Sequence, residues 1–111
     1  MKLRPLLPSL REKKRYLAFE GQTEEKVDFE HAKKSIELSM KGFLGDLGMA
    51  RAGVLFLNDW KQNRGIMKMN TKYVDEIKAS LALVQEVAER KAIIRSIGVS
   101  GALEKIRSVY F

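Results

Sequence analysis

The spacing of apolar residues changes twice along this chain from that of a strand to that of a helix, and this order limits the fold more than any other feature. Apolar or alternating runs typical of strands occupy four segments: Lys14–Glu20, Ala52–Asn58, Gly65–Asn70 and Lys91–Val99. A helical pattern separates the first segment from the second, and another separates the third from the fourth. The expected order is therefore β-α-β-β-α-β.

The first helical pattern begins near Asp28, a residue type that caps the amino end of helices well. Its apolar side chains recur at spacings of three and four: Phe29, Ala32, Ile36, Met40, Phe43 and Leu47. Such a stripe lies along one side of a helix and packs on a core. We expect this helix to end at Gly45 and Gly48, since glycine commonly terminates helices.

The second helical pattern follows the strand at Gly65–Asn70 and has one apolar stripe: Val74, Ile77, Leu81, Val84 and Ala88. Leu83 and Val87 widen the stripe, so we expect this helix to be buried on more than one side. A short third helix is predicted at Ala102–Val109, with Ser100 as its N-cap.

The two middle strands differ in pattern. Gly53–Leu57 is an unbroken apolar run, which is typical of a central strand covered on both faces. In Gly65–Asn70, by contrast, Met67 and Met69 face one way and the residues between them face the other. The polar segment Asp59–Asn63 predicts a hairpin loop between the two strands.

These elements predict an α+β fold, a ferredoxin-like or RRM-like β-α-β-β-α-β sandwich with an extra C-terminal helix. Four antiparallel strands would pack on two helices through one face of the sheet and leave the other face free. The length of 111 residues allows one core. We expect a single domain over residues 1–111, with an extended arm at 1–12 and the C-terminal helix at 101–111.

The formal net charge of +7 is unevenly spread along the chain. Residues 1–15 carry a net charge of +5, residues 16–60 a net charge of −3, and residues 61–111 a net charge of +5. Four cations stand where the first strand begins: Arg11, Lys13, Lys14 and Arg15. Segregation of this kind favours a surface that binds a polyanion such as a nucleic acid.

Composition argues against several other functions. The chain has no cysteine, which excludes disulfides and thiolate metal sites and fits a reducing compartment. No apolar run approaches the roughly 18 residues that a membrane span requires. The lone histidine, His31, has no catalytic partner near it in sequence. We therefore expect no catalytic residue, no metal or cofactor bound by the protein itself and no membrane contact, and we expect a cytoplasmic location.

RNA-recognition motifs bind RNA on the sheet face that carries no helices. Their signature on the third strand requires a cation, a glycine and two aromatic residues. Arg64 and Gly65 match its start, but Ile66 and Lys68 replace the aromatic residues. Base stacking is therefore not expected there, and the predicted phosphate contacts are cations: Arg11, Lys13, Lys14, Arg15, Arg64, Lys68 and Arg95.

A second basic element is predicted at the third helix. Gly98 and Gly101 bracket its start, where free backbone N–H groups can bind a phosphate. The candidate RNA contacts of this element are Ser100, Gly101, Lys105 and Arg107. The same segment is equally consistent with a tight turn between a strand and a helix.

Apolar residues in two places are candidates for protein contact. Trp60 lies in the predicted hairpin loop, and an exposed tryptophan often marks an interface. The free face of the sheet and the apolar residues around Gly45–Gly53 are the other candidates. The predicted partner-binding residues are Phe56, Trp60, Gly48 and Ala50.

Four segments, taken in order, resemble those of archaeal ribonuclease P protein component 2, a family of small RRM-like subunits of ribonucleases P and MRP. The segments are Leu7–Tyr16 (LPSLREKKRY), Arg64–Ile66 (RGI), Ala79–Leu83 (ASLAL) and Gly98–Gly101 (GVSG). Each segment alone has low specificity, but the ordered set is specific. The resemblance extends from about Leu6 to Lys105, which is nearly the whole chain.

The resemblance implies a non-catalytic subunit of the ribonucleoprotein that removes the 5′ leader of precursor tRNA. It implies that the catalytic RNA and its bound Mg²⁺ perform the cleavage, while the protein supports the fold of that RNA. It also implies a protein partner, the TIM-barrel-like protein component 3 of ribonuclease P, often in a two-plus-two heterotetramer.

Two alternatives of other classes stay open on the residues alone. A structural adaptor that contacts only proteins would carry its basic charge incidentally and bind RNA no more tightly than any protein of charge +7. A ferredoxin-like regulator would bind a small metabolite, which requires a pocket with convergent polar groups.

Overall fold

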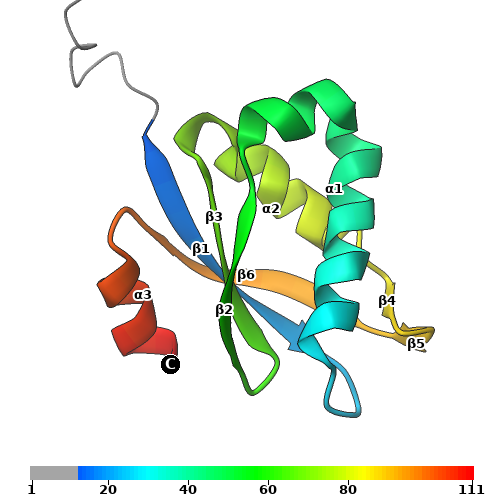
Figure 1. The fold of residues 1–111 in the computed structure, drawn as a ribbon. Coiled ribbons are helices and arrows are strands. Elements are labelled where there is room, and N and C mark those ends of the chain that lie inside the picture. The colour runs from blue at the N-terminus through cyan, green and yellow to red at the C-terminus, as the bar shows by residue number, and fades with distance from the viewer. Residues whose placement is uncertain (1–12) are drawn as a thin grey trace, which may run out of the picture.

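The computed structural model describes residues 13–111, and a four-stranded antiparallel sheet lies at their centre (Figure 1). Its strands, in spatial order, are β2 (Leu55–Lys61), β3 (Arg64–Asn70), β1 (Lys14–Gln22) and β6 (Ile93–Ser100). With the helices α1 (Phe29–Ala52) and α2 (Val74–Ala82), this arrangement is the predicted ferredoxin-like sandwich. The predicted arm at 1–12, including Arg11, lies outside the described residues.

Alternation along β1 gives the sheet two different faces. Leu17 and Phe19 are fully buried on the face that α1 and α2 cover. Met67 and Met69 of β3 point into the same core, as the alternating pattern predicted. The Phe19 ring packs edge-on against Phe56, with 6.1 Å between the ring centroids. This main core holds the two helices on the sheet.

The opposite face of the sheet is covered, and the expectation of a free face was wrong. The helix α3 (Leu103–Tyr110) packs on it, on the side opposite α1 and α2 (Figure 1). Ala18 and Ile66, which point away from the main core, form a second small core with Ile106 of α3. Because only two residues separate α3 from β6, the helix turns back over the apolar centre of the sheet.

The strand β2 is an edge strand, not the central strand that its apolar run predicted. It begins at Leu55 because α1 extends through Ala52 and ends at Gly53, whose φ of 58° closes the helix. The strand also includes Asp59 and Trp60, which the sequence analysis placed in a loop. The hairpin turn is only Gln62–Asn63, with φ of 52° and 60°, the left-handed backbone that two-residue hairpin turns favour.

Gly45 kinks α1 instead of ending it. Its φ of 73° and ψ of 175° interrupt the helical backbone, and the helix then resumes. The expected stripe is buried as far as Met40, but Phe43 and Leu47 on either side of the kink are exposed. Asp28 is the N-cap, as predicted.

The second helical pattern runs past the end of the helix that it predicted. A 3-10 turn at Thr71–Tyr73 precedes α2, and α2 stops at Ala82. Val84 and Val87 are buried, but they belong to a connecting segment and to a small hairpin. The strands of this hairpin are β4 (Glu86–Val87) and β5 (Arg90–Lys91). Leu83 is exposed, so the expected second buried side of the helix is absent.

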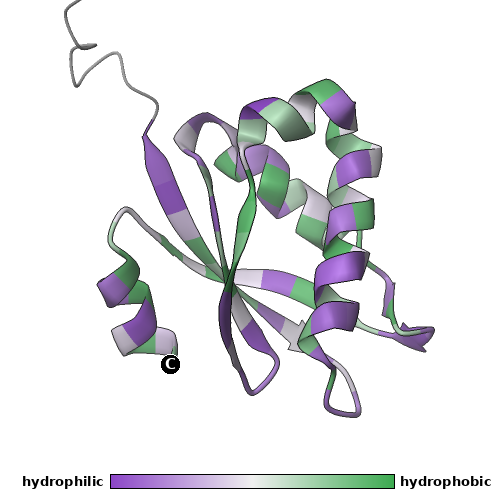
Figure 2. Cartoon of the chain, viewed as in Figure 1, coloured by the Kyte–Doolittle hydropathy of each residue, from purple (hydrophilic) through white to green (hydrophobic). Residues whose placement is uncertain are grey.

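Among residues 13–111, no helix combines the length and the apolar sequence that crossing a bilayer demands. Figure 2 shows the start of β1 as hydrophilic and the part of β1 near the centre of the sheet as hydrophobic. The strand therefore joins a charged end to a buried middle.

Candidate nucleic-acid interface

The first residues of β1 bring four cations together at one end of the sheet. Lys14 and Arg15 open the strand, and Lys13 precedes them. The register pairs Tyr16 with Lys68 of β3, so Lys68 lies beside the same end of β1. We call Lys13, Lys14, Arg15 and Lys68 the β1 rim. The sequence analysis predicted all four as phosphate contacts.

Local contacts fix the backbone and the side chains of the rim. The Thr71 N–H donates to the Lys13 carbonyl oxygen at 2.8 Å, which ties this segment to the end of β3. Lys68 Nζ lies 5.9 Å from the centroid of the Tyr16 ring, within the range of a cation–π interaction. Arg15 Nη1 donates to the Lys14 carbonyl oxygen at 3.1 Å. These contacts orient the cations without neutralising them.

The Arg15 side chain lies against Gly101, in the turn between β6 and α3. A methyl group on Gly101 would stand 3.2 Å from Arg15 Nη1, so the glycine leaves room for the guanidinium. Within residues 13–111, none of the four rim cations forms an ion pair. The positive charge of the rim is therefore available to an external polyanion.

Arg64 and Arg95 do not belong to this rim, which corrects the single patch that the sequence predicted. The register places them opposite Glu20, one on each neighbouring strand. At about 3.3 Å per residue, Glu20 lies roughly 20 Å along β1 from Lys14. Arg95 is exposed and forms no ion pair among the residues described.

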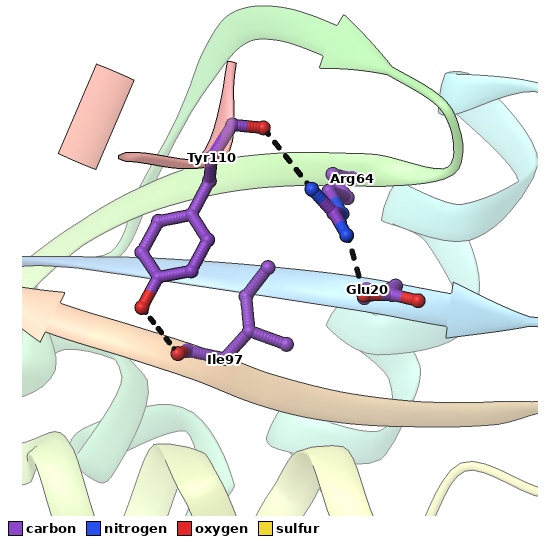
Figure 3. A network of polar contacts seen from close by, with 4 residues as sticks. All are labelled: Glu20, Arg64, Ile97 and Tyr110. Atoms are coloured by element: carbon purple, nitrogen blue, oxygen red, sulfur yellow. Dashed lines mark hydrogen bonds and ion pairs between the residues drawn. The ribbon is translucent and has the colours of Figure 1, made fainter. Parts of the chain in front are cut away.

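Arg64 is held by two acceptors (Figure 3). Its Nε donates to Glu20 Oε2 at 3.3 Å, and its Nη1 donates to the Tyr110 carbonyl oxygen at 3.4 Å. A guanidinium that is already paired with a carboxylate has less to gain from a phosphate. Sequence reasoning missed Glu20 because its place between two arginines depends on the strand register.

The second predicted basic element is mostly occupied by internal contacts. Arg107 donates to both carboxylate oxygens of Asp59, from Nε and Nη2, each at 3.0 Å. This hydrogen bonding and the charge of Asp59 raise the pKa of the Arg107 guanidinium above its ordinary value. Lys105 is exposed and unpaired within the described part of the chain. Only Lys105 therefore offers a free cation from this helix.

The segment Gly98–Gly101 forms a tight connection, as the alternative interpretation held. Ser100 is the last residue of β6, and its Oγ accepts from the Ala102 N–H at 3.1 Å. The N-cap of α3 is Ala102, not Ser100 as predicted. A methyl group on Gly98 would overlap the Tyr110 ring, so this glycine makes room for α3.

The predicted partner-binding residues lie in two different environments. Phe56 and Trp60 are half-buried against the main core, and the Trp60 ring centroid is 5.3 Å from that of Phe29. Trp60 therefore stabilises the fold and is not an exposed loop residue. Gly48 and Ala50 lie on α1 beyond the kink, where Ala50 is exposed.

One further cation near the rim escaped the sequence analysis. Lys72 is exposed and follows Asn70, the residue that pairs with Lys14. Its backbone N–H donates to Asn70 Oδ1 at 3.1 Å, which fixes the start of the 3-10 turn. The sequence did contain a signal for Lys72, since this cation stands two residues after the predicted strand Gly65–Asn70.

A hollow of about 990 Å³ lies between the β1–α1 connection and the β4–β5 hairpin. Among its charged side chains, Glu25 pairs with Arg90 and Asp28 with His31, whereas Glu24, Lys26 and Lys91 form no ion pair within the described residues. Within residues 13–111, no three acidic or histidine side chains are placed to hold a metal ion.

Comparison with known proteins identifies the family. Residues 15–111 match the model of the Rpp14/Pop5 family. A ribonuclease P protein component 2 from Thermococcus gammatolerans is 39% identical over 103 residues, which cover 92% of this chain and 86% of the relative. The same component from Pyrococcus abyssi is 33% identical over 111 residues, covering 99% of this chain and 94% of the relative.

A solved structure supports the fold independently. A chain of yeast ribonuclease MRP, determined by cryo-EM, superimposes with a TM-score of 0.65 at 14% identity. The match covers 84% of this chain and 77% of that chain. Together with the sequence matches, it confirms the resemblance that the four sequence segments predicted. The chain belongs to the Rpp14/Pop5 family.

Proposed function

We propose that this chain is a non-catalytic protein subunit of ribonuclease P, which supports the catalytic RNA in removing the 5′ leader of precursor tRNA. Its relatives carry the name of that enzyme's component 2. The observation that carries the proposal is the β1 rim, four cations at one end of the sheet that form no ion pair within residues 13–111. A cytoplasmic location follows from the same assignment.

The rim supports this role through the phosphates of folded RNA. Lysine and arginine contacts to phosphate position a protein without reading sequence. Their charge also reduces the repulsion between RNA strands that pack closely, and divalent cations otherwise screen this repulsion. The cleavage and its Mg²⁺ are assigned to the catalytic RNA, as the resemblance to ribonuclease P subunits implies.

Omission of this chain from a reconstituted enzyme should reduce precursor-tRNA cleavage, most strongly at low Mg²⁺. The reconstitution contains the catalytic RNA and protein component 3, and the 5′ leader released is measured over a series of Mg²⁺ concentrations. The rate lost at low Mg²⁺ should return as Mg²⁺ is raised, because added cations replace part of the screening. Equal rates with and without the chain at every concentration would support the adaptor alternative.

We further propose that protein component 3 binds beside the kink of α1. Phe43 and Leu47 are 49% and 64% exposed there. A hollow of about 240 Å³ opens between this part of α1 and the start of β2, and Met40, Met49, Val54 and Phe56 form its apolar part. Glu37, Lys41 and Asp46 also line this hollow, and Lys41 pairs with Asp46. Because its lining is largely apolar and its one lysine is already paired, this surface favours a protein occupant over RNA.

Replacing Phe43 with aspartate should abolish a stable complex with component 3, because the substitution puts a charge on the apolar surface. RNA binding through the rim should change little. Val109→Asp is the matched control, since Val109 is 66% exposed on α3 and carries the same change of charge. Co-elution of the two proteins in size-exclusion chromatography is the measurement. Loss of the complex in both variants, or in neither, would contradict this location.

A further inference from the structure

The sheet face beneath α3 carries an aromatic ring that the third-strand signature does not reveal. Tyr16 of β1 points to this face and packs against the small core of Ala18, Ile66 and Ile106. Lys68 of β3 lies over the same ring. A ring beside a cation is suited to an unpaired nucleotide, because the base stacks on the ring while its phosphate meets the charge.

The cover over this ring is a single short helix. The helix α3 has 8 residues, and its N-cap Ala102 makes no side-chain cap hydrogen bond. A helix of this length is unstable in isolation, so it depends on its contacts with the sheet. Ile106 is its one fully buried side chain, and Leu103 and Tyr110 are half-buried against the same small core. In the ion pair of Arg107 with Asp59 the two side chains are 48% and 22% exposed, so solvent screens part of the attraction between them.

Removal of α3 would change the electrostatics of the face as well as its shape. Arg64 would lose the Tyr110 carbonyl oxygen as an acceptor, and Arg107 would leave Asp59. The Tyr110 hydroxyl, which donates to the Ile97 carbonyl oxygen at 2.6 Å, would also be released (Figure 3). The Tyr16 ring and a less constrained Arg64 would then lie with Lys68 on an open sheet face.

We propose that α3 is a displaceable cover over a second RNA site, at which Tyr16 stacks on one unpaired base. This inference rests on the proposed RNA-binding function. Tyr16 directly follows Arg15 of the rim, so an RNA strand can keep its phosphates on the rim while its next base enters the site. The rim then binds folded RNA when α3 is closed, and the open face adds an unpaired nucleotide.

Ile106→Asp opens the cover, because a carboxylate cannot remain in the small core without a partner. Val109→Asp is the control, with the same charge change on the same helix at an exposed position. The probe is an unstructured oligouridylate, compared with an RNA duplex of equal charge. Ile106→Asp should bind the oligouridylate about tenfold more tightly than Val109→Asp does, and duplex affinity should be the same for both variants. Adding Tyr16→Leu to Ile106→Asp should remove the gain.

Hydrogen exchange of the α3 amides shows whether the cover is open. If these amides lose protection in Ile106→Asp while oligouridylate affinity stays at the level of the control, the inference is wrong. If the double variant with Tyr16→Leu keeps the gain in oligouridylate affinity, the inference is also wrong, because the Tyr16 ring would then not contribute to binding.

If Ile106→Asp does not fold, Tyr110→Phe repeats the comparison without a change of charge. It removes only the hydrogen bond to Ile97, and Tyr73→Phe is its control. A gain of about twofold to threefold in oligouridylate affinity is expected, and equal affinity of the two variants would overturn the inference. The proposed function is judged separately, by cleavage in the reconstituted enzyme. If the chain supports cleavage but the α3 variants show no gain in oligouridylate affinity, the proposed cover is refuted and the proposed function is not.

Discussion

Replacing Lys13, Lys14 and Arg15 together with alanine should weaken binding to the catalytic RNA about 100-fold or more at about 0.1 M salt. Each phosphate contact releases counterions and is worth roughly 0.7 to 0.9 units of log K per tenfold change in salt. Three such contacts therefore account for the loss. The measurement is a titration of labelled RNA, followed by cleavage of precursor tRNA at low Mg²⁺, which should slow in parallel.

The matched control removes the same amount of charge from the other side of the molecule. Lys34, Lys78 and Lys91 are exposed on α1, α2 and β5 and form no ion pair within the described residues, and their replacement with alanine should weaken binding much less. Similar losses in the two triple variants would show that net charge alone attracts the RNA. In that case the rim is not a site, and the adaptor alternative gains support.

Phe19→Ala should lower the free energy of unfolding by about 3–5 kcal/mol. Phe19 is fully buried in the main core, where its ring contacts those of Phe56 and Trp60 at centroid distances of 6.1 and 6.2 Å. Alanine would leave a cavity beneath α1 and take away these aromatic contacts. Urea unfolding followed by circular dichroism measures the change.

Val109→Ala is the control for this prediction, because an exposed side chain contributes within about 0.5 kcal/mol. A loss below about 1 kcal/mol for Phe19→Ala would mean that the two helices are held on the sheet by something other than this core. The packing of β1 against α1 and α2 would then need revision.

The order of elements could be predicted because strands and helices differ in the period of their apolar residues. Buried positions such as Leu17, Ile36 and Met67 fall on the expected faces for this reason. The edge position of β2 could not be predicted, since an apolar run also results when a strand is covered by α1 on one face and approached by α3 on the other. Val84 and Val87 continue the helical spacing although the backbone has left the helix.

The kink of α1 and the place of α3 depend on tertiary structure. Gly45 has the same local signal as a helix-ending glycine, and only the resumed helix distinguishes a kink from an end. The stripe of α3 is too short to show which surface it covers. Its docking over Ala18 and Ile66 depends on Ile106 meeting these two residues across the sheet, a contact between segments far apart in sequence.

The β1 rim was predictable because three of its four cations, Lys13, Lys14 and Arg15, are consecutive where β1 begins. The remaining candidates were not, because their pairing depends on residues far away in sequence. Arg64 meets Glu20 through strand register, and Arg107 meets Asp59 through the docking of α3. A count of positive charges cannot show which of them are already occupied.

The salt dependence of RNA binding tests the central claim, that the β1 rim and not the arginines beside Glu20 contacts the RNA. The slope of log K against log salt is measured for the unmodified chain, for the Lys13, Lys14 and Arg15 triple variant and for an Arg64 and Arg95 double variant. We expect the triple variant to lower the slope by about two to three, and the double variant to lower it by less than about one. An unchanged slope in the triple variant, or a larger change in the double variant, would contradict the account.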